Sequence, residues 1–106
     1  MVTIDEFKNI ELVIAQIKEA ADHPDADRLY VLKVDIGDQE KQIVAGIKKS
    51  YQKEDLIGKY VIVVNNLDPV TLRGVESSGM LLAASDDDGV VILSPERPIN
   101  PGTRVK

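Results

Sequence analysis

The sequence predicts an all-β fold: a closed five-stranded barrel with a short helix between strands 3 and 4 and added N- and C-terminal segments. Three observations predict it. Apolar stretches of strand length alternate with clusters of turn residues. The first stretch is long and changes register, as expected of a bent strand that serves both halves of a small barrel. The segment 47–56 is too polar for a strand and lies between the third and fourth apolar stretches.

The N-terminal part begins with residues 3–6, TIDE, which match a capping box that opens one helical turn. Ile10, Leu12 and Ile14 then occupy every second position, the period of a half-buried strand. The alternation slips at Ala15-Gln16, because the next large apolar residue is Ile17, and this predicts a β-bulge. Residues 23–25, HPD, form a turn.

The remaining elements follow at short intervals. Residues 47–56 are expected to form a short helix that stops at Gly58. Residues 86–89, DDDG, predict a hairpin turn, and the tail 95–106 carries three prolines and is expected to be extended. The predicted strands after the first are 29–36, 41–45, 60–64, 80–85 and 90–93.

Three strands, one helix and two strands is the element order of the OB-fold, here with a C-terminal hairpin added. The strand count alone would also suit an SH3-like barrel. The helix between the third and fourth strands favours the OB-fold.

Composition limits the class of protein. A chain of 106 residues predicts one domain, 1–106, and without cysteine it has no disulfide or thiolate metal site. No apolar run is long enough to span a membrane and no signal-peptide pattern is present, so a cytoplasmic location is expected. The Gly58-Lys59 pair lacks the preceding glycine of a P-loop, and a calcium loop centred on Gly89 fails at both ends. The only histidine, His23, precedes a proline and is interpreted as a turn residue. We therefore expect no catalytic residue, metal or cofactor.

Charge argues against indiscriminate binding of nucleic acid. The chain has 13 basic and 18 acidic residues, a net charge of −5. A local basic patch can still attract a polyanion. The acidic residues cluster at 35–40 and 86–88, and basic residues gather at 48–59, with Arg28 and Arg73 outside that segment. This distribution is compatible with a confined, shape-specific site.

The segment 65–86 carries the strongest functional signal. Gly74 and Gly79 bracket a short polar stretch between two apolar strands, as expected of a recognition rim. Five further motifs accompany its RGVESSGM stretch along the chain. The six motifs are His23-Pro24-x-Ala26-Asp27-Arg28-Leu29, Val34-Asp35-Ile36-Gly37, Ile43-Val44-Ala45-Gly46-Ile47, Leu56-Ile57-Gly58-Lys59, Asn66-Leu67-x-Pro69 and Arg73-Gly74-Val75-Glu76-Ser77-x-Gly79-Met80.

In these motifs the chain resembles the tRNA-binding domain at the C-terminus of many methionyl-tRNA synthetases, which also occurs as free-standing structure-specific tRNA-binding proteins. The resemblance implies that the Ser-x-Gly-Met stretch lines the binding pocket at the barrel mouth. Ser77, with Ser78 beside it, would hydrogen-bond a base, and Met80 would lie against a base face. Arg73 would contact a phosphate or a base edge. The alternative is a polar loop in which Met80 begins the buried strand.

Three more residues are candidates for tRNA contact. Arg28 matches a basic position of the family, although it could be a solvated charge paired with Asp27. Asn66 matches the family's Asn-Leu-x-Pro asparagine, whereas its neighbour Asn65 is expected to serve the turn. Lys49 could contact phosphate, although it could equally lie on the solvated face of a helix. The chain departs from the family by lacking basic residues around Asn-Leu-x-Pro and near Val13, which predicts a lower affinity.

The resemblance implies a non-catalytic domain that assists the catalytic part of a methionyl-tRNA synthetase. The alternative is a protein-interaction module, such as the related small bacterial secretion chaperone. A binder of single strands is less well supported, because the chain has one Phe and three Tyr to stack on bases. A homodimer is also predicted, because Val90, Val91, Ile92 and Leu93 place apolar side chains on both faces of a hairpin outside a closed barrel.

Overall fold

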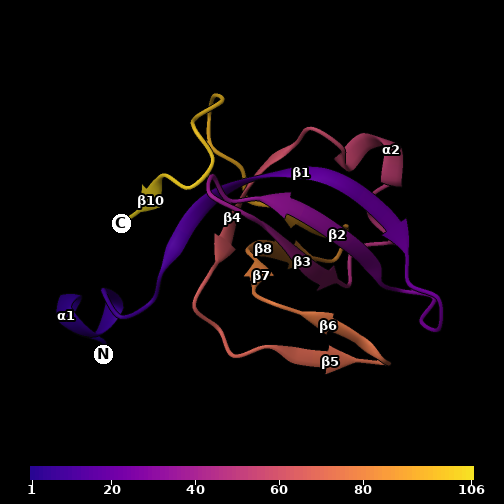
Figure 1. The fold of residues 1–106 in the computed structure, drawn as a ribbon, viewed down its shortest axis with the longest axis horizontal. Helices are drawn as coiled ribbons and strands as arrows, with labels where there is room; N and C mark the ends of the chain where they lie inside the picture. Colours follow the sequence, from indigo (N-terminus) through magenta and orange to yellow (C-terminus); the bar gives the residue numbers. More distant parts are fainter.

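The computed structural model describes residues 1–106, and Figure 1 shows their arrangement. The elements are α1 (Ile4–Phe7), β1 (Leu12–Asp22), β2 (Tyr30–Asp35), β3 (Glu40–Ala45), α2 (Lys53–Leu56), β4 (Tyr60–Val64), β5 (Val70–Leu72), β6 (Val75–Ser77), β7 (Met80–Leu81), β8 (Ala83–Asp86), β9 (Gly89–Ile92) and β10 (Arg104–Val105).

A bent, antiparallel sheet in the order β3-β2-β1-β4-β7 forms the barrel. The first half of β1 pairs with β4 and its second half pairs with β2. One long strand thus serves both parts of the wall, as the sequence predicts for an all-β, OB-like fold. No helix is both long enough and apolar enough to cross a membrane.

The predicted bulge is wrong in its position. The register of β1 against β2 shifts between Ile17 and Glu19, not at Ala15-Gln16. Val13, Ala15 and Ile17 keep the strand period without a slip and belong to the barrel core. Leu12 and Ile14, which alternate with them, are also buried. They lie outside that core, where the C-terminal tail crosses β1. With both faces of this strand covered, apolar alternation cannot locate a bulge.

The barrel closes between β3 and β7 through residues 76–78. The Ser78 amide donates to the Gln42 carbonyl at 2.8 Å, and the Gln42 side chain donates to the Glu76 carbonyl at 2.9 Å. Gly79 follows with φ of 127°, and a Cβ atom there would lie 2.9 Å from the Val64 carbonyl oxygen. A side chain at this position would therefore separate the strands that the segment joins.

Fifteen buried side chains fill the barrel, and one of them, Leu56, comes from α2 and has no exposed surface. The helix is shorter than predicted. Residues 48–50 form turns, and α2 covers only Lys53–Leu56. The helix still lies between β3 and β4, as expected for the OB order.

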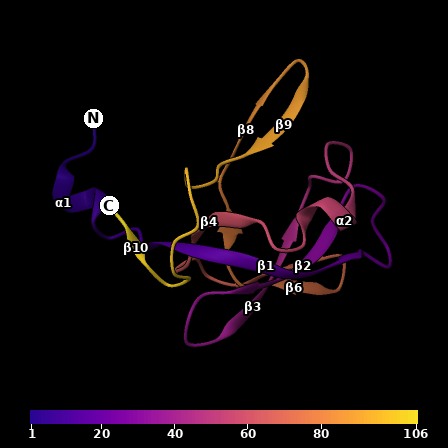
Figure 2. The same ribbon diagram turned by 90° about the horizontal axis from the view of Figure 1, so that it is seen from above.

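Two hairpins lie outside the main sheet. The predicted fifth strand, 80–85, is divided: β7 stays in the barrel, whereas β8 leaves it to pair with β9 around the predicted 86–89 turn. This hairpin projects from the barrel in Figure 2. The β5-β6 hairpin was not predicted, because its strands have three residues each and leave too little pattern to recognise.

The chain termini meet at one end of the molecule. The predicted capping box between Thr3 and Glu6 is present, yet α1 has no buried residue. Beside α1, β10 pairs with the start of β1 (Figures 1 and 2). Ile4, Phe7, Ile10 and Val105 line a predominantly apolar groove there, and we call these four residues the terminal surface.

Candidate nucleic-acid interface

Two loops meet at the end of the barrel opposite the termini (Figure 1). One joins β1 to β2 and comprises residues 23–29. The other joins β4 to β7, comprises residues 65–79 and contains the β5-β6 hairpin. The corresponding loops of OB-folds, between strands 1 and 2 and between strands 4 and 5, bind oligonucleotides. A nucleic-acid site is therefore expected on these two loops.

His23 links the two loops. Its side chain is 5% exposed, and its Nδ1 atom accepts a hydrogen bond of 2.9 Å from the Asp25 amide. Because an accepting nitrogen carries no proton, the proton of the neutral ring lies on Nε2. That nitrogen donates to the Leu72 carbonyl at 2.8 Å. The sequence predicted only the turn role of His23, since nothing in the local pattern indicates a partner 49 residues away.

Arg73 occupies the tip of the β5-β6 hairpin. Leu72 pairs with Val75, so Arg73 and Gly74 form a two-residue turn with φ of 49° and 86°. Positive φ at both positions is typical of a type I′ turn, which favours Asn, Asp or Gly. Arg73 is the only residue other than glycine with positive φ in the chain. An unfavourable backbone conformation at an exposed arginine is a feature that occurs at functional sites.

Arg28 and Arg73 line the same cleft, which has a volume of about 380 Å³. The structure thus brings together two predicted tRNA-binding residues that are 45 positions apart. Asp25 and Asp27 line the cleft as well, and Arg73 makes a long contact of 3.4 Å to the Asp25 carbonyl. The cleft therefore offers two guanidinium groups beside an equal number of carboxylates, which suits a small number of phosphate contacts and not a strongly basic surface.

Lysines flank this end of the barrel. Asp22, the residue before His23, pairs with Lys48 at 3.1 Å and with Lys53 at 3.0 Å. Hydrogen bonds from Lys53 and then Lys48 hold the pKa of Asp22 below its ordinary value, and the hydrogen bond with Asp22 raises the pKa of Lys53. The predicted Lys49 is exposed, makes no ion pair and lines an adjacent cleft. Of the three lysines, Lys49 is the one with a free charge.

The structure does not favour the predicted contact of Ser77 with a base. Ser77 is completely buried, its hydroxyl accepts from the Val44 amide at 3.0 Å and it donates to the Gly79 carbonyl at 3.0 Å. It closes the barrel, and since the side chain is fully buried and its proton is already donated, it offers no donor to a base. Ser78 is half-buried and makes no side-chain hydrogen bond. Met80 is half-buried and packs against the core, in agreement with the alternative that it begins a buried strand.

The structure gives the two asparagines partners other than those predicted. Both ends of the Asn66 amide bind backbone: its oxygen accepts from the Glu11 amide at 2.9 Å, and its nitrogen donates to the Asn9 carbonyl at 2.7 Å. Asn66 thereby fixes the segment between α1 and β1, far from the arginine cleft. In Asn65 the side-chain nitrogen binds Glu11, whereas the buried side-chain oxygen has no partner.

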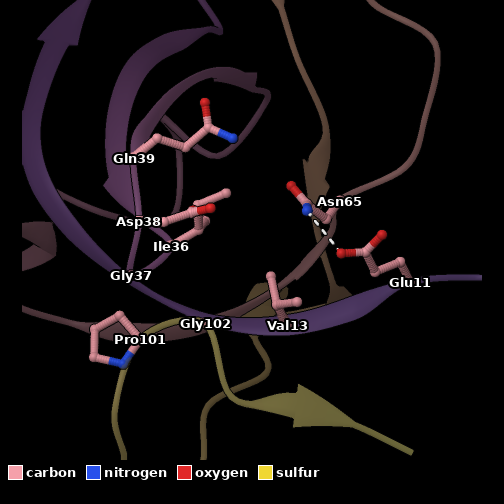
Figure 3. Close-up of a pocket in the computed structure, with 9 residues that line it drawn as sticks. All are labelled: Glu11, Val13, Ile36, Gly37, Asp38, Gln39, Asn65, Pro101 and Gly102. Atoms are coloured by element: carbon pink, nitrogen blue, oxygen red, sulfur yellow. Dashed lines mark hydrogen bonds between the residues drawn. The ribbon is translucent and has the colours of Figure 1, made fainter.

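A second cleft, next to Asn65, has the wrong charge for a polyanion. Figure 3 shows it between β1, the β2-β3 turn and the C-terminal tail. Glu11 and Asp38 line it and no basic side chain does. Its volume, about 380 Å³, equals that of the arginine cleft. Charge therefore distinguishes the two, and the arginine cleft is the candidate for RNA.

The predicted dimer residues divide into two sets. Val90 and Ile92 pack against the barrel core, so they are not available to a partner. Val91 and Leu93 are 62% and 40% exposed. The prediction of apolar side chains on both faces was right, but one face covers this chain's own core.

The fold and the arginine cleft together define a small OB-like barrel that carries two arginines on the loops through which other OB-folds bind oligonucleotides. Residues 12–104 match the family model described as "Putative tRNA binding domain", and the chain belongs to this family.

Methionine--tRNA ligase of Thermococcus kodakarensis is 51% identical over 99% of this chain, and that of Nanoarchaeum equitans is 45% identical over 100% of it. The chain spans 14% of the length of each of these relatives.

Solved structures agree with this family. A MetRS-related protein from Pyrococcus horikoshii matches with a TM-score of 0.93 and 36% identity, over 100% of this chain and 98% of that one. The CsaA chaperone protein from Picrophilus torridus matches with a TM-score of 0.93 and 33% identity over 100% of both chains. The family and fold expected from the sequence motifs are thus confirmed.

Proposed function

We propose that this chain is a non-catalytic, structure-specific tRNA-binding module that assists the catalytic part of a methionyl-tRNA synthetase in the cytoplasm. The observation that carries the proposal is the shared cleft of Arg28 and Arg73 on the two loops that OB-folds use for oligonucleotides. The family model and the methionine--tRNA ligase relatives support tRNA as the ligand. A weak second site on the same assembly raises the effective concentration of tRNA at the enzyme.

The aromatic side chains favour structured RNA over single strands. Single-strand binders stack bases on exposed aromatic rings. Tyr30, the best-placed candidate, is 4% exposed and its hydroxyl donates to the Tyr51 carbonyl. The Tyr51 hydroxyl in turn accepts from the Ile92 amide. With these rings engaged inside the protein, recognition rests on phosphate positions and on the shape of a folded RNA.

The decisive experiment is a titration with tRNA, using duplex DNA and single-stranded RNA as competitors. We expect neither competitor to displace tRNA efficiently. Two to four phosphate contacts per subunit would give a gentle salt dependence, with log K falling by about 0.7 to 0.9 per contact for each unit of log salt.

Matched variants localise the site. Arg28→Ala and Arg73→Ala should each weaken binding and lower the salt slope by about one unit. Arg97→Ala is the control, because Arg97 is an exposed arginine on the C-terminal tail. Asn66→Ala should leave the slope unchanged, because its amide binds backbone. Equal effects of Arg73→Ala and Arg97→Ala would refute the proposed site.

We further propose that the module is a homodimer joined through the terminal surface. Ile4 lies in the capped helix α1 and is 66% exposed, and Ile10 lies in the segment after it and is 44% exposed. An exposed apolar surface at the meeting point of both termini is suited to a self-complementary, two-fold contact.

A second candidate function is binding of unfolded polypeptide, which the similarity to the CsaA chaperone protein favours. In that case the exposed apolar residues, and not the arginine cleft, would carry the activity. Competition between labelled tRNA and a reduced, unfolded protein separates the two. Displacement of polypeptide by tRNA, together with sensitivity to Arg73→Ala, supports tRNA binding.

A further inference from the structure

We propose that His23 is a positioning residue for the RNA site: in its neutral form, with the proton on Nε2, it holds Arg28 and Arg73 in one cleft. The proposal rests on the proposed function for its RNA readout. It concerns a residue that itself lies buried behind the cleft and does not line it.

The two ring nitrogens of His23 are used in different loops. Nδ1 accepts from the Asp25 amide, which fixes the turn that leads to Arg28. The backbone amide of His23 also donates to the Leu29 carbonyl at 3.1 Å and closes that loop at its far end. Nε2 donates to Leu72, the residue directly before Arg73. One ring thus sets the relative position of the two arginine-bearing loops.

No other bond between these loops is as short. The contact from Arg73 to the Asp25 carbonyl measures 3.4 Å, near the limit for a hydrogen bond, whereas the His23 to Leu72 bond measures 2.8 Å and is buried at its His23 end. The backbone of Arg73 is in an unfavourable left-handed conformation, so its turn needs support from outside the hairpin. The bond to Leu72 provides this support one residue away.

Two substitutions separate the two bonds of the ring. In His23→Asn, the shorter side chain can still accept from the Asp25 amide, as asparagine does in Asx turns, but cannot reach Leu72. In His23→Gln, the longer amide can donate to the Leu72 carbonyl. We expect His23→Asn to weaken tRNA binding about five-fold, the loss expected for one hydrogen bond of average strength. His23→Gln should restore most of the affinity.

A double-mutant cycle tests positioning directly. If His23 acts by placing Arg73, then His23→Asn should weaken binding in the wild-type and Arg97→Ala backgrounds but have little further effect in Arg73→Ala. An equal loss in the Arg73→Ala background would overturn the proposal. So would an affinity that His23→Asn leaves unchanged.

A measurement without RNA distinguishes failure of this inference from failure of the proposed function. Long-range ¹H–¹⁵N NMR of the His23 ring should show a protonated Nε2 and an unprotonated Nδ1. Backbone relaxation should show residues 70–77 ordered in the wild type and in His23→Gln, and more mobile in His23→Asn. If wild type fails to bind tRNA while these results hold, the loop coupling stands and only the ligand is wrong. A proton on Nδ1, or unchanged order in His23→Asn, would overturn the coupling itself.

Discussion

The hydroxyl of Ser77 lies 3.0 Å from the amide nitrogen of Val44 and accepts its hydrogen bond in the fully buried barrel wall. The same hydroxyl donates to the Gly79 carbonyl. One side chain thereby satisfies two backbone groups at the point where β3 meets the segment before β7. A residue in a motif that indicates RNA binding is, in this structure, a closing element of the barrel.

Ser77→Ala should therefore destabilise the fold. It leaves the buried Val44 amide without an acceptor, which costs about 1–3 kcal/mol. For a domain of this size, the melting temperature should fall by several degrees, about 4–8 °C per kcal/mol. Thermal unfolding followed by circular dichroism measures the shift. Ser78→Ala is the matched control, because the Ser78 side chain makes no hydrogen bond. A loss of tRNA affinity in Ser77→Ala with an unchanged melt would place Ser77 at the ligand.

Asp22→Asn should strengthen tRNA binding. The carboxylate pairs with both Lys48 and Lys53 near the proposed RNA site, and its removal leaves both ammonium groups free to meet phosphates. The salt slope should then become steeper by about one to two units, and Asp38→Asn on the β2-β3 turn is the control.

The same pairing has a pH dependence of known sign. The pKa of Asp22 is lowered in the folded state by its hydrogen bonds to Lys53 and Lys48. The pairing therefore favours folding above the unfolded-state pKa, and this contribution is lost as pH falls through the lower, folded-state value. The effect on stability should be small, because the pair is exposed. Acid titrations of the wild type and Asp22→Asn should converge at low pH. Curves that stay parallel through the acid range would show that Asp22 is not the titrating group.

Met80→Ala should lower the melting temperature and leave tRNA affinity at low temperature unchanged. Met80 packs against the core and pairs with Val64 across β4 and β7. The loss should be about 2 kcal/mol, at the low end for Met→Ala, because the side chain is half-exposed. Leu67→Ala is the control, since Leu67 is 48% exposed. Weaker tRNA binding without a change in the melt would place Met80 against a base.

A dimer joined through the terminal surface and a dimer joined through the β8-β9 hairpin would respond to different substitutions. Ile4→Ser and Ile10→Ser should convert the protein to a monomer at micromolar concentration, whereas Val91→Ser and Leu93→Ser should not. Light scattering measures the mass. A monomeric wild type would refute the dimer, and dissociation by the hairpin variants alone would assign the contact to the surface that the sequence indicated.

Local features of the fold could be read from the sequence. The capping box, the 86–89 turn and the fourth strand, 60–64, depend on residues within a few positions of one another, and all three are confirmed. The all-β class and the order of strands in the barrel follow from the lengths of such segments and from their order along the chain. The family follows from motifs spread along the chain.

The direction and partner of each polar side chain depended on tertiary structure. Nothing local distinguishes Ser77 from Ser78, or Asn65 from Asn66, since each pair has the same chemistry in adjacent positions. The acceptor role of Ser77 depends on an amide 33 residues away, and the roles of both asparagines depend on residues near the N-terminus.

The candidate site combines both kinds of information. By itself, the sequence determined the barrel, its family and the presence of Arg28 and Arg73 in family motifs. Tertiary structure decided that these two arginines share a cleft and that His23 joins their loops. The physical reason is that a hydrogen bond such as His23–Leu72 forms only after the barrel brings distant loops together, whereas turns and strand periods arise from neighbouring residues.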